Sequence, residues 1–267
     1  MPNHVSNILI VKGTNEKVVE VIKVLMNDNE EVTFDNFFPM PEEIKGTTSP
    51  TRIATQEEYN EKKAELERKL ANGEQVWSTS LPITEEMQSD LINKYGVDNW
   101  YDWAVQNWGT KWGAYSGYAL SEDSLYFQSA WSTPYNAMVK LSEMYPDVEI
   151  NVQYADEDFG RNVGEYILKG GDEIDSNVPE GGSMEAMRMA LDIQGGEDYY
   201  LGDNIYEMLE DDIHDSWYNK FLHLIIEKEI IDEEYPTFVN EYLLEQAVEN
   251  EQFEYSSKLR DILKVEN

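Results

Sequence analysis

The alternation of apolar and polar residues predicts a sheet built from short, separated segments. These segments are rich in β-branched and aromatic residues and are bounded by glycine, proline or short polar turns. We expect strands over residues 4–12, 32–38, 111–120, 125–131, 148–154 and 162–169. Pro39 and Pro41 end the second of these segments, because proline cannot continue a central strand. The predicted sheet therefore draws its strands from two distant stretches of the chain.

Apolar residues at helical spacing fill the intervals between these strands. Thr14 or Asn15 can cap a first helix whose apolar face includes Val18, Ile22 and Leu25. Further helices are expected over residues 56–71, 84–95, 99–108 and 134–144. Gly170, Gly171, Pro179, Gly181 and Gly182 predict a linker, and beyond it only helices are expected, over residues 183–193, 203–214, 217–231 and, in two pieces, 237–264.

This order of elements predicts an α+β protein. The order strand, helix, strand, inserted helices, strand, strand, helix, strand, strand fits a ferredoxin-like antiparallel sheet with two helices on one face and a helical insertion at about residues 42–108. An all-helical C-terminal part would follow, ending in a helical hairpin over residues 237–264. Residues 1–171 carry 28 acidic and 14 basic side chains, whereas residues 172–267 carry 26 and 6. This shift in charge predicts two domains, 1–171 and 172–267.

The acidic balance excludes several classes of partner. With 54 acidic and 20 basic side chains, the chain has a net charge of -34. Such a field repels nucleic-acid phosphates and anionic membranes, so we expect neither direct nucleic-acid binding nor membrane binding.

The absence of cysteine excludes disulfides and thiolate metal sites. The apolar run Ile8–Val11 is too short for a signal sequence or a membrane span, which predicts a cytoplasmic protein.

Several stretches in residues 1–170 resemble the YubB-type ferredoxin-like domain family of plasmids and phages. They are, in order, 2–7 (PNHVSN), 34–43 (FDNFFPMPEE), 107–115 (NWGTKWGAY), 129–134 (SAWSTP) and 154–157 (YADE), followed by Gly160. The resemblance implies the fold and an origin in a mobile element. It implies no catalytic mechanism.

The C-terminal stretch 241–264 resembles the interaction motif shared by the B and C subunits of the bacterial nucleotide-excision nuclease, the UVR motif. The matching residues are Leu244, Ala247, Phe253, Glu254, Leu259, Arg260, Asp261 and Ile262. They predict two short helices in a hairpin, with Phe253 packing the turn. The resemblance implies a protein contact made by Phe253, Arg260 and Asp261. A hairpin that only caps the helical part is the alternative.

Catalytic and metal-site patterns are missing from the sequence. Of the three histidines, His4 is expected to make a structural hydrogen bond, and His214 and His223 have no matching ligand pair. The acidic run Asp156–Asp158 lacks the spacing of a calcium loop, and Arg161 can neutralise it in a polar hairpin loop. We therefore expect no catalytic residue, no metal and no cofactor.

The tryptophans between residues 100 and 131 predict either a core cluster or a small pocket. Such residues mostly bury apolar area. If a ligand pocket exists in this part of the chain, we expect it beside Trp108, Lys111, Trp112 and Trp131.

The remaining signal is an acidic helical face at Glu207, Glu210, Asp211, Asp212 and Asp215. A dense row of carboxylates can contact a basic protein, or can imitate the regularly spaced charges of duplex DNA toward a DNA-binding protein. A solvated face is the alternative. The sequence therefore favours a non-enzymatic protein-binding adaptor or inhibitor encoded by a phage or plasmid. The alternatives are a DNA-mimic antagonist of a host nucleic-acid-binding or defence protein, and a small-ligand-binding domain.

Overall fold

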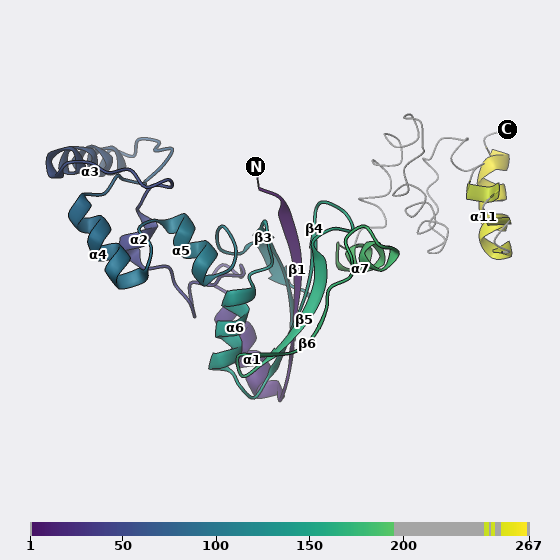
Figure 1. Cartoon of the computed structure of the whole chain (residues 1–267). Coiled ribbons are helices and arrows are strands. Elements are labelled where there is room, and N and C mark those ends of the chain that lie inside the picture. Colours follow the sequence, from purple (N-terminus) through teal and green to yellow (C-terminus); the bar gives the residue numbers. More distant parts are fainter. Residues whose placement is uncertain (1, 195–242, 246, 249–251, 266–267) are drawn as a thin grey trace. The chain divides into compact units, whose positions relative to one another are not determined.

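The computed structural model describes residues 2–194, 243–245, 247–248 and 252–265 (Figure 1). Six strands form one sheet in the order β2-β3-β1-β4-β5-β6, and β3 pairs antiparallel with both β1 and β2. The strands are β1 (His4–Lys12), β2 (Tyr115–Ala119), β3 (Ser124–Ala130), β4 (Glu149–Asp156), β5 (Val163–Lys169) and β6 (Asp172–Asn177).

Eight helices are described, and four of them lie between α1 and β2. The helices are α1 (Asn15–Leu25), α2 (Glu42–Lys45), α3 (Gln56–Ala71), α4 (Glu85–Tyr95), α5 (Trp100–Asn107), α6 (Tyr135–Met144), α7 (Met184–Gln194) and α11 (Phe253–Val265). The insertion therefore interrupts the chain between the first helix and the second strand of the sheet, whereas the sequence analysis placed a strand at 32–38 before it.

The chain order β1, α1, β2, β3, α6, β4 combined with the sheet order β2-β3-β1-β4 is the ferredoxin-like arrangement. The predicted α+β class is confirmed. In Figure 1, α1 and α6 lie on the same side of the sheet. The strands turn one set of alternate residues toward the core, among them the fully buried Leu9, Phe127 and Ile150. On α6, Met138 and Leu141 are also fully buried.

The predicted strand over residues 32–38 is wrong. Val32 forms only an isolated bridge with Met26, and the chain then turns, with the backbone N–H of Phe38 donating to the carbonyl of Phe34 at 2.8 Å. Phe34 is buried against Phe127, with ring centroids 5.9 Å apart. The apolar run therefore fills the core as a turn and does not extend along the sheet edge. The second strand of the fold is β2, which the sequence placed within 111–120.

The part of the chain expected to hold only a linker and helices begins with a strand, which the sequence analysis missed. Residues 172–177 form β6 at the sheet edge beside β5. Gly170 and Gly171, expected in a linker, have φ angles of 62° and 89° and form the turn between the two strands. The described chain falls into two compact units, residues 1–153 with 165–176, and residues 154–164 with 177–267. The predicted division at residue 171 stays a prediction.

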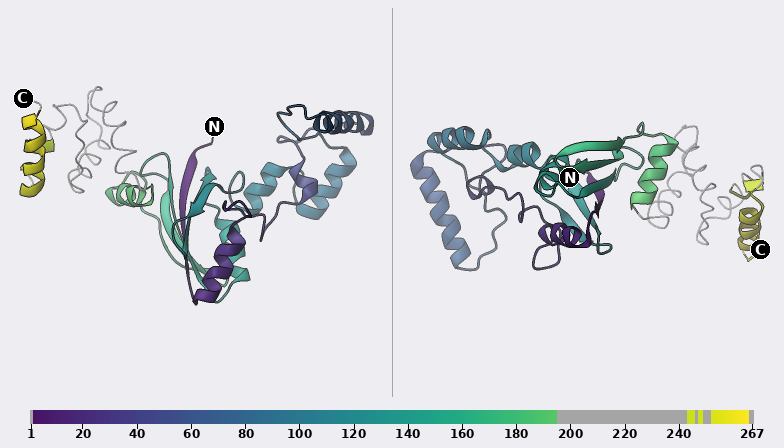
Figure 2. Two further views of the ribbon diagram at one scale, coloured as in Figure 1. Left: turned by 180° about the vertical axis from the view of Figure 1, so that it is seen from behind. Right: turned by 90° about the horizontal axis from the view of Figure 1, so that it is seen from below.

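The inserted helices begin at the residues that the sequence indicates. Thr55 and Glu58 form a reciprocal capping box at the start of α3, and the Thr84 side chain caps α4. Gly96 ends α4 in the left-handed conformation. Figure 2 shows α3 away from the sheet in both views, and no residue of α3 is buried. This helix is therefore held by local caps and not by a core.

Two further predictions concern the end of the chain. Helix 183–193 is confirmed as α7, whereas the helices at 203–214 and 217–231 lie outside the described residues.

Among the residues that the structure describes, no helix combines the length and the apolar character that crossing a bilayer requires.

Candidate functional site

Five of the predicted partner-binding residues fall in a part of the chain that the structure does not describe. These are Glu207, Glu210, Asp211, Asp212 and Asp215. His214 and His223 also lie outside the described residues. The acidic-face hypothesis therefore rests on the sequence alone.

Four apolar residues of the predicted C-terminal hairpin are fully buried. Tyr255 and Leu259 on α11 are fully buried, as are Leu243 and Ala247 on the preceding segment. The backbone N–H of Gln252 donates to the carbonyl of Ala247 at 2.9 Å.

The predicted role of Phe253 as the residue that packs this turn is wrong, because its side chain is 74% exposed. The buried aromatic residue is Tyr255, two positions later, which lies on the inner face of α11. Arg260 and Asp261 are exposed on the same helix as Phe253. The three residues expected to contact a partner are therefore all on the surface, and Val248 beside the turn is also exposed.

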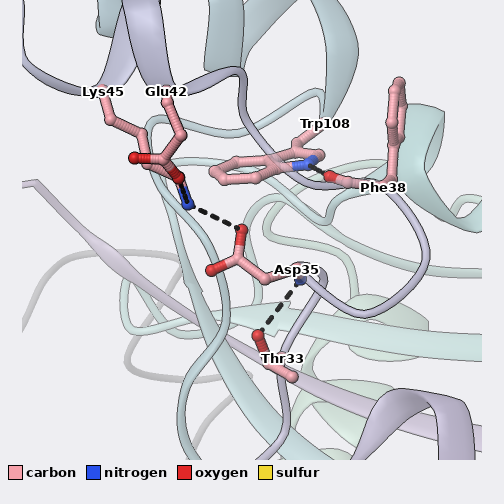
Figure 3. A network of polar contacts seen from close by, with 6 residues as sticks. All are labelled: Thr33, Asp35, Phe38, Glu42, Lys45 and Trp108. Atoms are coloured by element: carbon pink, nitrogen blue, oxygen red, sulfur yellow. Dashed lines mark hydrogen bonds and ion pairs between the residues drawn. The ribbon is translucent and has the colours of Figure 1, made fainter.

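Trp108 is a core residue and not part of a surface pocket. It is 5% exposed, and its indole Nε1 donates to the carbonyl of Phe38 at 2.9 Å (Figure 3). Its ring lies edge-on to Trp103 and to Phe34, with centroids 5.2 and 5.8 Å away. This contact joins the 107–115 stretch to the 34–43 stretch.

A second polar contact closes the same region. Lys45 on α2 lies 3.0 Å from the carboxylate of Glu42 and 3.9 Å from that of Asp35 (Figure 3). The backbone N–H of Asp35 donates to the hydroxyl of Thr33 at 3.1 Å. These contacts hold the loop between α1 and α2 at Asp35.

The other three residues of the predicted pocket do come together. The Nζ of Lys111 lies 4.9 Å from the ring centroid of Trp112 and 4.4 Å from that of Trp131. Trp131 is 45% exposed and has a φ of 71°, and Tyr101 on α5 packs edge-on to its ring at 6.0 Å. A bulky residue with positive φ is uncommon, and such conformations gather at functional positions. We call Lys111, Trp112 and Trp131 the lysine–tryptophan cluster.

Backbone contacts fix the lysine–tryptophan cluster in place. The Thr110 hydroxyl both donates to the carbonyl of Ala130 at 2.7 Å and accepts from its N–H at 3.1 Å. The Ser132 hydroxyl donates to the carbonyl of Gly109 at 2.6 Å, and the N–H of Trp131 donates to the carbonyl of Asn3 at 3.0 Å. The stretches 107–115 and 129–134 therefore fold as one unit.

His4 makes the hydrogen bond that the sequence predicted. Its Nδ1 lies 2.6 Å from the hydroxyl of Tyr115, and that hydroxyl donates to the carbonyl of Ser129 at 3.1 Å. Since the tyrosine has one proton to give, Nδ1 must be the protonated nitrogen when both bonds form. The role of His4 is to join β1 to β2.

The acidic run after β4 is a polar hairpin loop. Asp156 accepts from the N–H of Asp158 and from the Asn162 side chain, both at 2.9 Å. The guanidinium of Arg161 lies 3.9 Å from the Asp158 carboxylate, which confirms its neutralising position.

The sequence interpretation missed a cavity of about 620 Å³ in the inserted segment. Its floor includes Ile83 and Leu91, and its mouth carries Glu43, Asp90 and Lys94. Two isolated parallel bridges, Thr47 to Leu81 and Ile53 to Ile83, fold the 79–83 segment back toward α2. The available signal was on α4, where cavity-lining residues recur at helical spacing. They are Met87, Asp90, Leu91 and Lys94.

An ion pair spans the mouth of this cavity. Lys94 Nζ and the Tyr95 hydroxyl each lie 2.7 Å from the Glu43 carboxylate and donate to it. These bonds, that of Lys94 first, lower the pKa of Glu43 to about 2 and raise the pKa of Lys94. Glu43 is therefore charged at every physiological pH.

Comparison with known proteins identifies part of the chain. Residues 107–207 match the family model described as the ferredoxin-like domain in Api92-like protein. This stretch is therefore similar to the ferredoxin-like domain of Api92-like proteins. A crystal structure of the protein api92 from Yersinia pseudotuberculosis is similar at 14% identity over 68% of this chain and 100% of that chain, with a TM-score of 0.35. No curated protein matches the chain.

The matched Api92-like stretch includes the lysine–tryptophan cluster. The cavity and the C-terminal hairpin lie outside it.

Proposed function

We propose that this protein is a non-enzymatic, cytoplasmic protein-binding adaptor or inhibitor whose C-terminal hairpin contacts a protein partner. The observation that carries the proposal is the position of Phe253. Its side chain is 74% exposed, whereas Tyr255 and Leu259 on the same helix are fully buried. The Phe253 side chain is therefore accessible to a partner.

Burial of such a side chain in an interface is favourable. Removing apolar surface from water contributes about 25 cal/mol per Å², and a phenylalanine buries roughly 150 Å² or more. Exposed Val248 extends the apolar surface, while Arg260 and Asp261 supply charged neighbours on α11. An aromatic anchor with a polar surround is the usual composition of an interface hot spot.

The net charge of -34 indicates what kind of partner this would be. It favours rapid association with a basic protein, including one that itself binds nucleic acid. The DNA-mimic alternative uses the face from Glu207 to Asp215 and is supported by the sequence pattern alone.

We further propose a YubB-type domain in residues 1–170 and a UVR-like contact element at the C-terminal end. The order of the five matching stretches supports a YubB-type domain over residues 1–170 and an origin in a phage or plasmid. The hairpin over residues 243–265 supports a UVR-like contact element, although Tyr255 takes the packing position expected of Phe253.

The test is affinity purification of the full-length protein from bacterial lysate, with Phe253→Ala compared with Trp77→Ala. Trp77 is 91% exposed in the inserted segment, so both variants remove an exposed aromatic ring. Truncating a hot-spot aromatic costs about 2 kcal/mol or more, which is roughly thirtyfold in affinity. We expect partners to be lost only with Phe253→Ala. An identical set of partners from both variants and the wild type contradicts the proposal.

The lysine–tryptophan cluster supports a second candidate, a small-ligand site of unknown activity. The specific observation is the left-handed backbone of Trp131, which presents a half-exposed indole beside Lys111. A ligand that stacks on this indole would protect it from a collisional quencher in fluorescence. Screening for ligands that reduce quenching in the wild type but not in Trp131→Ala tests this candidate.

A further inference from the structure

The cavity in the inserted segment has the features of a binding site for a small molecule. It lies between α2, α4 and the 79–83 segment, and its volume is about 620 Å³. Ligand pockets are commonly about 300–1,000 Å³ in volume and combine an apolar lining with a few polar groups. We propose that this cavity binds a small organic amine, with the apolar body of the amine on the floor and its ammonium group at Asp90.

The floor of the cavity suits an apolar body. Ile83 and Leu91 are almost completely buried, and Met87 and Leu81 complete the apolar lining. Thr47 also lies there, but its hydroxyl already donates to the carbonyl of Ile44 and accepts from the N–H of Trp100. A ligand therefore meets mainly hydrocarbon at the bottom of the cavity.

The mouth of the cavity has an excess of negative charge. Glu43 is paired with Lys94, and Glu42 is paired with Lys45 at 3.0 Å. Within the part of the chain that the structure describes, no side chain pairs with the Asp90 carboxylate. Asp90 is therefore the carboxylate best suited to pair with the ammonium group of a ligand.

The rest of the protein supports the same sign of ligand. A net charge of -34 raises the local concentration of cations and lowers that of anions near the surface. The apolar floor offers no ligands for a bare metal ion, whereas an amine that carries a hydrocarbon body uses both the floor and the mouth. This ligand class does not depend on the proposed role of Phe253.

The test is isothermal titration calorimetry of the full-length protein with three indole compounds that differ mainly in the charge of their end group. Tryptamine carries a positive charge, tryptophol is neutral and indole-3-propionate is negative. Hexylamine, hexanol and hexanoate repeat the comparison with a flexible body. We expect the amine of at least one series to bind about threefold or more tightly than its neutral counterpart, because an exposed ion pair contributes a few-fold in affinity.

Substitutions then locate the site. Asp90→Asn should remove most of the preference for the amine and leave binding of the neutral compound unchanged. Asp28→Asn makes the same change at an exposed carboxylate outside the cavity and should leave the preference intact. Raising the salt concentration should also weaken the preference.

Three results overturn the proposal. They are the absence of saturable amine binding in both series, equal affinity for the amine and its neutral counterpart, and equal amine binding by Asp90→Asn and Asp28→Asn. None of them bears on the partner-binding test, which uses Phe253 and a different readout.

Discussion

The indole Nε1 of Trp108 donates a hydrogen bond of 2.9 Å to the backbone carbonyl of Phe38, 70 residues earlier in the chain. This bond connects the end of α5 with the loop that enters the insertion. The chain therefore enters and leaves the inserted segment, which contains the cavity, at neighbouring positions. The buried Trp108 side chain connects these two positions.

Two substitutions of Trp108 should separate the contribution of its hydrogen bond to stability from the contribution of its packing. Trp108→Phe keeps an aromatic ring but removes the donor to Phe38, which should lower the free energy of unfolding by about 1–3 kcal/mol. Trp108→Ala also empties the core and should cost about 3–5 kcal/mol. Urea denaturation measures both values. Trp77→Phe, at an exposed position, should change the value by less than about 0.5 kcal/mol, and a similar result for Trp108→Phe would contradict the assignment.

Gly117 is needed because Val32 packs directly over β2. A Cβ at Gly117 would lie 2.6 Å from the Cβ and Cγ2 of Val32 and 3.1 Å from the Cβ of Phe127. Gly117→Ala should therefore lower the free energy of unfolding by about 1–3 kcal/mol. Gly46→Ala is the matched control, because no atom lies within 4 Å of the added Cβ and the φ of Gly46 is negative. Thermal unfolding of the two variants should differ clearly, and equal midpoints would show that Val32 can move away.

The sequence was sufficient for those elements whose local signals agree with the global fold. The β-branched residues of 4–12 predicted β1, and runs of helix-forming residues predicted α3 over 56–71 and α4 over 84–95. Each of these signals acts within a few residues of the chain, so no tertiary contact was needed to interpret it.

The errors arose where tertiary contacts decide the structure. Phe34 and its neighbours have the composition of a strand, but they fill the space between Trp108 and Phe127 as a turn. The exposed edge strand Asp172–Asn177 has no apolar face, so its position depends on pairing with β5 and leaves no periodicity in the sequence. The spacing of residues on α4 indicates one wall of the cavity, but no local pattern indicates that α2 and residues 79–83 form the others.

The pKa of Glu43 should depend on Lys94. The Lys94 ammonium is the largest cause of the lowered value of about 2, followed by the Tyr95 hydroxyl. Lys94→Met should therefore raise the pKa of Glu43 toward its ordinary value of 4.5, and Tyr95→Phe should raise it by less. Titration of the Glu43 side-chain carboxyl by NMR measures the change. Lys17→Met, which removes the partner of Glu20 elsewhere on the surface, should leave the Glu43 value unchanged.

The same shift has a consequence for stability. Because the folded pKa of Glu43 lies below the unfolded value, its contribution is fully present above about pH 4.5 and is lost as the pH falls toward about 2. Wild type and Glu43→Gln should therefore converge in stability over this range. A difference that persists unchanged to the lowest pH at which the protein is folded would contradict the ion pair.

Lys111 should stabilise the protein through its position between two indole rings. A partly exposed cation–π contact contributes about 0.5–1 kcal/mol, and Lys111 has two such contacts, with Trp112 and Trp131. Lys111→Met keeps most of the apolar stem but removes the charge, so the free energy of unfolding should fall by about 1–2 kcal/mol.

In a chain with a net charge of -34, losing any cation also increases self-repulsion. Lys140→Met controls for this effect, because Lys140 makes only a surface ion pair with Glu143 and should change stability by less than about 1 kcal/mol. If the two variants lose equal stability in urea denaturation, the effect belongs to the net charge and the rings contribute nothing. If Lys111→Met loses more, and the excess disappears in a Trp131→Ala background, the contact with Trp131 accounts for it.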